Sequence, residues 1–201
     1  GVDPRKVRVV RYPATDPGPP AALGEGFLFT SRLVPEKGCR LLLEAWQRSG
    51  TGRHSTLTIA GAGPESALAR AASGRDGVKY VGLVEPGTAS ELRTRSAVVV
   101  VPSLWNEPGS VAVTLALAAG RAVIATNVGG LPEAVDDAVG WCVPPTVSGL
   151  TAALEAASDR GQQRVKASRA RSRYEALYSE RQTMRLLLAT YEDLLRDSTG
   201  R

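Results

Sequence analysis

The sequence is poor in the residues that build disulfides and metal sites. It contains two cysteines and one histidine among 201 residues. Cys39 and Cys142 lie far apart, match no metal-ligand spacing and sit among apolar neighbours, so we expect two buried free thiols in a reducing compartment. His54 lies in the polar stretch GTGRHSTL ahead of an apolar run. This position predicts a surface residue far from the loops expected to form the site.

A long hydrophobic run is also lacking. The longest apolar stretch is interrupted by Gly120 and Arg121 after about ten residues, which is too short to cross a bilayer, and the start GVDPRKVRVV has no apolar signal core. Hydrophobic residues still make up 43% of the chain and charged residues 22%. This composition is typical of one globular domain with a proper core. We therefore expect a cytoplasmic domain with no spanning segment.

Negative charge is in the minority, because the formal net charge is +5. Seven arginines and lysines fall in the stretch 162–185, QQRVKASRARSRYEALYSERQTMR. Two interpretations stay open, a solvated helix face and a patch that faces a membrane surface. Aromatic residues amount to only 5% and no nucleic-acid recognition motif occurs, so nucleic acid is not an expected partner.

The order of patterns along the chain predicts an α/β fold. Residues 1–25 contain an expected short strand, KVRVVRYP, and a Pro- and Gly-rich linker, TDPGPPAALGEG. In residues 26–201, apolar runs alternate with helix-like segments of about ten to fifteen residues. That rhythm predicts βαβ units and a Rossmann-like parallel sheet of about six strands with helices on both faces. The expected strands lie within 27–30, 55–61, 78–82, 97–103 and 121–130, and the expected helices within 37–49, 66–74, 88–96, 110–120 and 149–159, followed by two basic C-terminal helices.

Ligands of open parallel sheets bind beyond the carboxyl ends of the strands, so the loops there are the candidate site. The loop SRLVPEKG after the first strand places Arg32 and Lys37 beside the start of a helix. Two cations and free helix amides suit a diphosphate. The alternative is a surface turn in which Glu36 pairs with Lys37 or Arg40.

A carboxylate precedes the apolar helix expected at 110–120. Glu107 is followed by Pro108, Gly109 and Ser110, so the free N–H groups of residues 109–111 would face an anion there. Glu107 could accept hydrogen bonds from sugar hydroxyls. The alternative is a helix-entry carboxylate that only satisfies backbone amides.

Two glycine-containing loops are less specific. The backbone of Gly82, Leu83 and Val84 could bind the edge of a nucleotide base, although this segment also fits an ordinary strand exit. The loop AGAGPE lacks the third glycine and the downstream acidic residue of a dinucleotide fingerprint, so NAD is rejected.

The order of these motifs resembles a known family. SRLVPEKG, AGAGPE, VGLV, PSLWNEPGS, AAGRAVIATNVGGLPEAV and GWCVPP follow one another as in the C-terminal, donor-binding half of family-4 retaining glycosyltransferases of the GT-B architecture. The start GVDPRKVRVVRYPA resembles the segment that leads out of their N-terminal domain. The resemblance covers nearly the whole chain.

The resemblance implies a role for each matching position. Arg32 and Lys37 would hold the diphosphate of a nucleotide diphosphate sugar donor without a metal ion or any other cofactor. Residues 82–84 would contact the base, and residues 109–111 would bind the distal phosphate or the sugar. Glu107 would contact sugar hydroxyls and orient the anomeric carbon for transfer with retention.

The sequence departs from the family pattern at several positions. Leu115 stands where a second glutamate should accept the ribose hydroxyls. Gly109 and Ser110 replace a phenylalanine and a glycine, and Thr146 replaces an aspartate. Either the ribose is held by other groups, or the use of the donor is altered or lost.

The resemblance also implies a missing partner, an N-terminal domain with the acceptor site and a catalytic histidine. The expected activity is hexosyl transfer to an acceptor hydroxyl, for which this half alone would be inactive, and a lipid acceptor would place the enzyme at a membrane. Two other functions stay open, a degenerate partner-binding or regulatory module and a nucleotide-sugar epimerase. The base, the sugar and the acceptor are not determined by these motifs.

Overall fold

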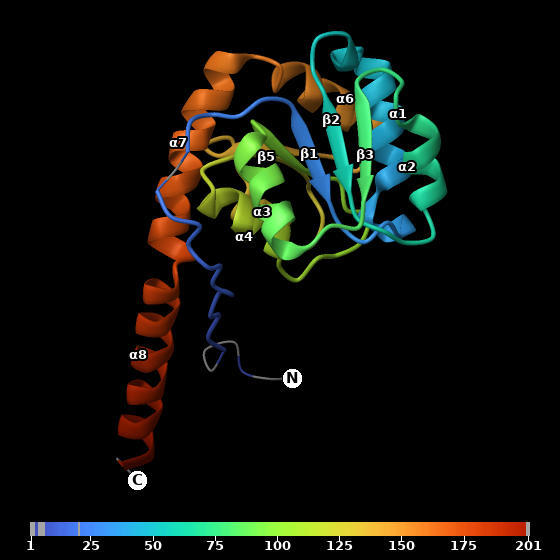
Figure 1. Cartoon of the computed structure of the whole chain (residues 1–201). Helices are drawn as coiled ribbons and strands as arrows, with labels where there is room; N and C mark the ends of the chain where they lie inside the picture. The colour runs from blue at the N-terminus through green and yellow to red at the C-terminus, as the bar shows by residue number, and fades with distance from the viewer. Residues whose placement is uncertain (1–2, 4–6, 20, 200–201) are drawn as a thin grey trace.

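The chain forms one sheet of six parallel strands (Figure 1). The computed structural model describes residues 3, 7–19 and 21–199. The strand order is β3-β2-β1-β4-β5-β6, which is the order of a doubly wound Rossmann-like sheet. The strands are β1 Phe27–Thr30, β2 Leu57–Ala60, β3 Val78–Gly82, β4 Val98–Val101, β5 Ala122–Thr126 and β6 Gly140–Val143. The expected fold class is thereby confirmed.

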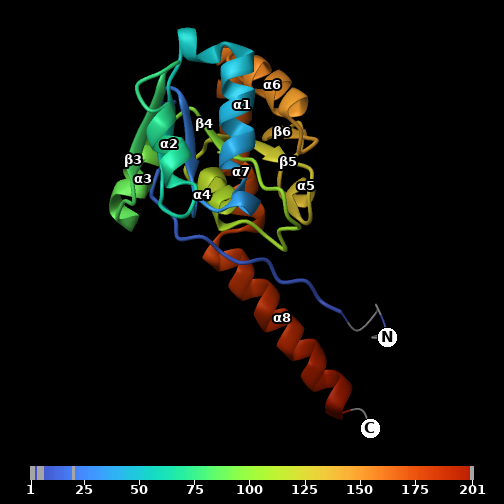
Figure 2. The same ribbon diagram turned by 90° about the vertical axis from the view of Figure 1, so that its right-hand side faces the viewer.

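Helices cover both faces of the sheet (Figure 2). One face carries α1, α2 and α6, and the other carries α4, α5 and α7. The helices are α1 Cys39–Ser49, α2 Ser66–Ala72, α3 Pro86–Arg95, α4 Val111–Ala118, α5 Leu131–Ala134, α6 Val147–Ala156, α7 Arg160–Leu177 and α8 Glu180–Thr199, with short 3-10 turns at Pro35–Lys37 and Thr51–Arg53.

The two cores follow from the alternation of side chains along the strands. In β4, Val98 and Val100 pack into the core under α1, whereas Val99 and Val101 pack into the core under α4 and α7. A strand with both faces covered must be apolar throughout, which explains the run of four valines. Each fully buried valine stabilises the fold by about 1.5–3 kcal/mol.

The N-terminal segment differs from its expected conformation. The described part of the expected strand, residues 7–13, has no regular secondary structure. Instead, the segment is attached to the α7 side of the domain. Tyr174 donates a hydrogen bond to the carbonyl of Ala14 over 2.8 Å, and the amide of Ala14 donates to the carbonyl of Tyr178 over 3.1 Å.

Much of the basic stretch 162–185 is bonded to the domain. Lys166 donates to the carbonyls of Asp137 and Gly140, and Arg171 and Arg173 form ion pairs with carboxylates. The other four basic residues are exposed, namely Arg164, Arg169, Arg181 and Arg185. The solvated-face interpretation therefore fits only part of the stretch.

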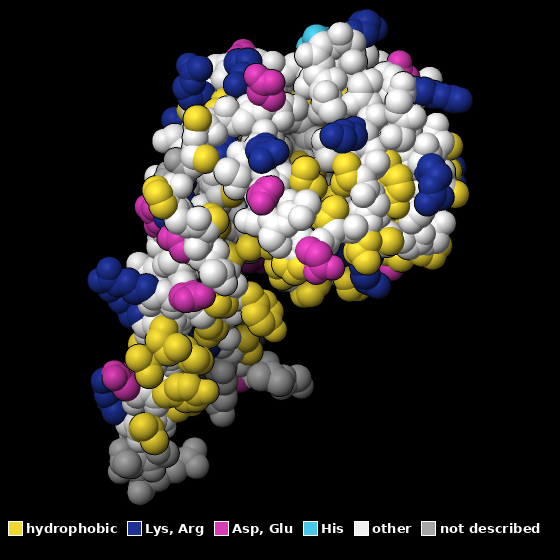
Figure 3. All heavy atoms as spheres, viewed as in Figure 1, with side chains coloured by type: hydrophobic (Ala, Val, Ile, Leu, Met, Phe, Trp, Pro, Cys, Tyr) yellow, Lys and Arg dark blue, Asp and Glu magenta, His cyan; other side chains and the backbone are white. Residues whose placement is uncertain are grey.

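Helix α8 projects away from the domain beside the N-terminal segment (Figures 1 and 2). Its surface carries a group of apolar side chains (Figure 3). The exposed ones are Met184, Leu186, Leu188, Tyr191, Leu194 and Leu195. Within the described residues, no helix combines the length and hydropathy that a membrane span requires.

The two cysteines and the single histidine lie in the environments predicted from the sequence, except that Cys142 is less buried than expected. Cys39 is a buried free thiol, and burial raises its pKa to about 11. Cys142 is a free thiol that is only half-buried. His54 is exposed and precedes β2, at the opposite end of the sheet from the candidate site loops.

Candidate functional site

The candidate site lies where the winding of the sheet reverses. β1 and β4 are neighbours, and the helices that follow them, α1 and α4, lie on opposite faces. Such a switch point leaves a crevice at the carboxyl ends of the two strands. A cavity of about 260 Å³ occupies this position. It is lined by Phe29, Thr30, Ser31, Lys37, Val100, Val101, Pro102, Ser103, Glu107, Gly109, Ser110, Val111 and Ala112.

The loop after β1 is held tightly against the loop after β4. Gly38 has a left-handed backbone with φ of 75°, and a Cβ atom at this position would overlap the carbonyl oxygen of Pro102. Only glycine fits both conditions. The amide of Leu104 also donates to the carbonyl of Glu36 over 2.8 Å. These contacts fix Lys37 next to the loop that carries Glu107.

Lys37 and Glu107 form the polar centre of the cavity. The Nζ atom of Lys37 is bonded to Oε1 of Glu107, and the hydroxyl of Ser103 donates to the same oxygen over 2.6 Å. Ser103 is itself oriented by Thr126, whose hydroxyl donates to the Ser103 carbonyl over 2.6 Å. Only 6% of Glu107 is exposed.

Both simpler interpretations of these charged residues are wrong. Lys37 pairs with Glu107 and not with Glu36, and Arg40 lies 4.0 Å from Glu65. Among the described residues, the carboxylate of Glu107 has side-chain donors and no backbone amide. The pair therefore bridges two loops of the crevice.

The backbone of Glu107 is fixed by the turn after β5. The amide of Gly130 donates to the Glu107 carbonyl over 2.6 Å. Gly129 has φ of 54°, and a Cβ atom there would overlap the backbone of Glu107. The GG sequence thus allows the turn to lie directly against the carboxylate-bearing loop.

The electrostatics favour an ionised carboxylate. Partial burial opposes ionisation of Glu107, but the hydrogen bonds from Lys37, Ser103 and Trp105, together with the charge of Lys37, outweigh it and lower the pKa of the carboxyl group. The ammonium group of Lys37 also lies 5.6 Å from the centroid of the Trp105 ring. At neutral pH the cavity therefore presents one cation and one hydrogen-bond acceptor side by side.

The start of α4 adds backbone donors to the same cavity. Ser110 caps the helix, and its hydroxyl accepts from the amide of Val113. The amides of Gly109, Ser110 and Val111 donate to no described protein group. They lie at the positive end of the helix dipole, so they are available to an anion.

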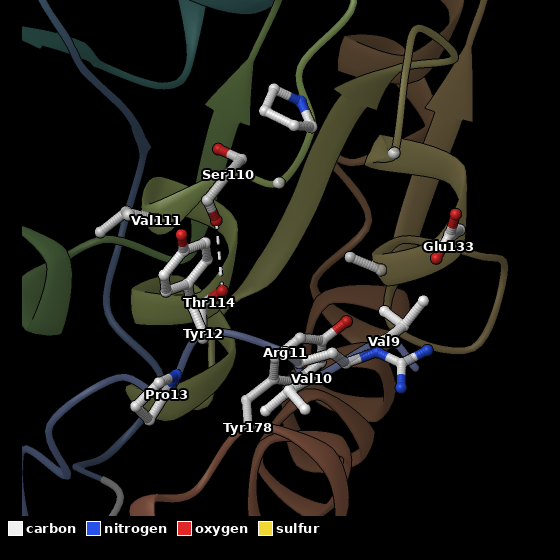
Figure 4. Close-up of a pocket in the computed structure, with 14 residues that line it drawn as sticks. Val9, Val10, Arg11, Tyr12, Pro13, Ser110, Val111, Thr114, Glu133 and Tyr178 are labelled. Atoms are coloured by element: carbon white, nitrogen blue, oxygen red, sulfur yellow. Dashed lines mark hydrogen bonds between the residues drawn. The ribbon is translucent and has the colours of Figure 1, made fainter. Parts of the chain in front are cut away.

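A second cavity, of about 160 Å³, lies on the other side of the same helix start (Figure 4). Residues Val9–Pro13 of the N-terminal segment form one wall, and Glu133, Ala134 and Tyr178 form part of the rest. Ser110, Val111 and Thr114 of α4 also border it (Figure 4). The start of α4, with its backbone amides, therefore borders both cavities.

Other predicted site residues lie outside the cavity. Arg32 is exposed and forms no hydrogen bond or ion pair with the described residues. Gly82, Leu83 and Val84 follow the edge strand β3, two strands or about 10 Å from β1. Leu83 is 79% exposed. Leu115 is partly buried and packs into the core between α4 and the sheet.

The remaining motif residues have structural positions. Cβ atoms at Gly61 and Gly63 would overlap the carbonyl oxygens of Ser31 and Leu33, so the AGAG loop packs on the loop that carries Arg32. Thr146 caps α6 by accepting from the amide of Gly149 over 3.1 Å.

Three residues of the site were missed in the sequence. Ser103 and Trp105 follow β4, and Thr126 ends β5. A signal existed for Ser103 and Thr126, because both stand at carboxyl ends of strands next to the switch point. Their mutual hydrogen bond depends on the packing of two strands, which the sequence did not show.

Comparisons with known proteins identify the family of the chain. The family model "Glycosyl transferases group 1" matches residues 24–159. Glycogen synthase of Mycobacterium tuberculosis is 34% identical over 154 residues, which are 72% of this chain and 37% of that protein. An uncharacterized glycosyltransferase of Methanocaldococcus jannaschii is 33% identical over 123 residues, which are 58% of this chain and 31% of that protein. The chain thus spans about a third of the length of these relatives.

Solved structures share the fold at low identity. Sucrose-phosphate synthase from Thermosynechococcus elongatus has a TM-score of 0.70 at 23% identity, over 94% of this chain and 50% of that one. The Anabaena protein HepE, solved in complex with UDP-glucose, has a TM-score of 0.71 at 20% identity, over 86% of this chain and 49% of that one. The chain therefore belongs to the group 1 glycosyl transferases, and its fold is that of the C-terminal domain of a GT-B glycosyltransferase.

Proposed function

We propose that this chain is the donor-binding half of a retaining glycosyltransferase, which transfers a sugar from a nucleotide diphosphate sugar to an acceptor hydroxyl. The observation that carries the proposal is the pair of Lys37 and Glu107 at the start of α4, in the crevice between β1 and β4. It joins a phosphate-binding cation, free amides and a sugar-binding acceptor within one cavity.

Lys37 would act on the leaving group. Negative charge grows on the diphosphate as the bond to the sugar breaks, so a cation already positioned there stabilises the transition state. Arg32 stands on the same loop with its side chain exposed, and the amides of residues 109–111 face the cavity from the other loop. With these donors supplied by the chain, the proposed transfer needs no divalent metal.

Glu107 would orient the sugar. Its carboxylate is ionised, is held by Ser103, and forms an ion pair with Lys37. Hydroxyl groups of a hexose are donors that such an oxygen accepts. By holding the sugar against the diphosphate, Glu107 would leave the anomeric carbon open on the face from which an acceptor would attack.

The nucleoside end would reach toward the edge of the sheet. Residues 82–84 lie at the end of β3, where Leu83 is exposed and Gly82 and Val84 are partly buried, and they would contact the base. Leu115 cannot accept a hydrogen bond, and loss of a charge-assisted pair costs about 1.5–3 kcal/mol, or roughly ten- to a hundredfold in affinity. We therefore expect weak binding of the ribose.

The acceptor and the catalytic histidine would belong to an N-terminal domain outside this chain. The apolar surface of α8 is a suitable contact for such a domain. We expect the chain alone to bind nucleotide without turnover. The two free thiols favour a reducing compartment, so we place the reaction in the cytoplasm, at a membrane surface if the acceptor is a lipid.

The test is calorimetric titration of the chain with UDP, GDP and ADP. One nucleotide should bind, Lys37→Ala should weaken it about ten- to a hundredfold, and Leu115→Glu should tighten it. Lys79→Ala is the matched control, because Lys79 is exposed on β3 and lines neither cavity. If none of the three nucleotides binds at millimolar concentration, to the wild type or to the Leu115→Glu variant, the result would contradict donor binding.

The packing of Leu115 into the core favours one second candidate, a degenerate module that keeps the fold but has lost donor binding. Nucleotide titration separates it from the first. Product analysis with the full-length enzyme separates transfer from the remaining alternative, epimerisation of a nucleotide sugar.

A further inference from the structure

An uncompensated buried cation lies at the other end of the sheet. Arg121 is 1% exposed, and its guanidinium group donates to the carbonyls of Ala22 and Ala21 over 3.0 and 3.2 Å. Its Nε atom is buried without a partner, and no carboxylate pairs with it among the described residues. Burial lowers the pKa of this side chain below its ordinary value. Buried charges are normally paired, so the arrangement indicates a missing anion.

Arg121 lines a cavity of about 330 Å³ between α7 and the N-terminal segment. This volume is within the range of small-ligand pockets. Ala21 and Leu23 form one wall, Gly120 and Arg121 another, and α7 the floor. On α7, the polar lining residues Arg164, Ser168 and Arg171 follow the spacing of one helix face.

The cavity has an excess of positive charge. Arg171 is already balanced, because it forms ion pairs with Asp16 and Glu175. Arg164 is exposed and forms no hydrogen bond or ion pair with the described residues, and Arg121 has only carbonyl partners. Two cations are therefore unmatched.

The available donors suit a phosphate group. Arginine presents several N–H groups in a fixed fork that matches phosphate oxygens. The cavity adds the hydroxyl of Ser168 and that of Ser172, which would exchange its long 3.4 Å hydrogen bond to the Ser168 carbonyl for one to the phosphate. A carboxylate would satisfy fewer of these donors.

This cavity is separate from the crevice of Lys37 and Glu107. Arg121 directly precedes β5, whereas Thr126 ends that strand next to Ser103. The two sites therefore lie at opposite ends of a five-residue strand, roughly 16 Å apart.

We propose that the cavity between α7 and residues 21–23 binds the phosphate group of a small soluble phosphorylated compound. Arg121 is the buried anchor, Arg164 covers the exposed side of the phosphate, and the serine hydroxyls complete the contacts. The site is independent of donor binding at the carboxyl ends of the strands.

The test uses the 201-residue chain, with inorganic phosphate and a hexose 6-phosphate as probes. Binding is followed by calorimetry and by the amide resonances of Ser168 and Ser172, with the Ser110 amide reporting on the donor crevice. Arg164→Gln is the diagnostic variant, because an exposed side chain without a hydrogen bond or ion pair to the described residues can be replaced without unfolding the domain. Arg169→Gln is the matched control, an exposed arginine on the same helix that does not line the cavity.

Both probes should shift the Ser168 and Ser172 amides. Arg164→Gln should lower this affinity about tenfold, while Arg169→Gln and the response to UDP stay unchanged. The proposal is overturned if Arg164→Gln binds like the wild type, or if only Ser110 responds. It is equally overturned if neither probe binds while vesicles of anionic lipid shift the two serines, since that result assigns the cavity to a membrane surface.

Discussion

Replacing Lys37 by methionine should destabilise the domain through Glu107. The change keeps the length of the side chain but removes the cation, so the carboxylate keeps only the uncharged donors Ser103 and Trp105. Breaking a fully buried pair costs about 3–5 kcal/mol. The side chain of Lys37 is 19% exposed and that of Glu107 7%, so water would partly replace the cation. We therefore expect a loss of about 2 kcal/mol in the free energy of unfolding at pH 7.

The stability difference between the wild type and Lys37→Met should depend on pH in a direction that identifies Glu107 as its cause. In the wild type the pKa of Glu107 is lowered in the folded state. The ionised carboxylate therefore stabilises the fold above the pKa of an unfolded glutamate, about 4.3, and this stabilisation is lost as the pH falls through the lower pKa of the folded state. In Lys37→Met the burial remains without the cation, which raises the folded pKa. The destabilisation is then complete at neutral pH, begins to diminish as the pH falls through the raised pKa of the variant, and is gone only below the lowered pKa of the wild type. The two unfolding curves should therefore converge on acidification.

Urea unfolding of the wild type, Lys37→Met and Lys37→Met/Glu107→Gln at pH 7 and pH 4.5 measures this. With an m-value of about 2 kcal/mol/M, the single variant should unfold about 1 M earlier at pH 7. The double variant should recover to within about 1 kcal/mol of the wild type, because a neutral amide needs no counter-charge.

Arg95→Met is the matched control. Arg95 pairs with Glu91 at 3.9 Å, with side chains 80% and 68% exposed, so its loss should matter little at either pH. The reasoning is refuted if Lys37→Met is as stable as the wild type at pH 7, or if the double variant is no more stable than the single one.

Three further predictions concern packing and reactivity. Gly38→Ala should destabilise the fold by about 2–4 kcal/mol in urea unfolding and should weaken nucleotide binding. The reason is that the backbone is left-handed at this position and the added methyl group would overlap the Pro102 carbonyl. An unchanged unfolding midpoint would contradict the close approach of the two loops. Trp46→Ala should cost about 3–5 kcal/mol, since this side chain is 1% exposed and donates to the backbone over 2.7 Å, and a loss below about 1 kcal/mol in thermal or urea unfolding would show that the site is not packed. At pH 8, a thiol reagent should modify the half-buried Cys142 before Cys39, whose pKa is raised to about 11; mass spectrometry of the labelled peptides would reveal the reverse order.

The N-terminal segment shows where local patterns mislead. The valines of KVRVVRYP have a high strand propensity, yet residues 7–13 form no strand. A strand requires a neighbouring edge to accept its hydrogen bonds. Both edges of the sheet, β3 and β6, lie elsewhere, and Val9–Pro13 line a cavity against α4 and α5 instead. Propensity alone could not predict that absence of a partner.

The sequence by itself determined five of the six strands, every long helix, and the two loops that carry Lys37 and Glu107, but it missed β6 and the short helix α5. These features depend on local spacing, such as the buried valine run of β4 and the glycines that permit left-handed turns, and local spacing is visible in the residue order. Only the tertiary structure decided that Lys37 pairs with Glu107, that Ser103 and Thr126 support this carboxylate, and that Arg121 is buried without an anion. Those contacts join residues from different strands and loops. Their distances are set by how the strands and helices pack, which no single segment of the sequence contains.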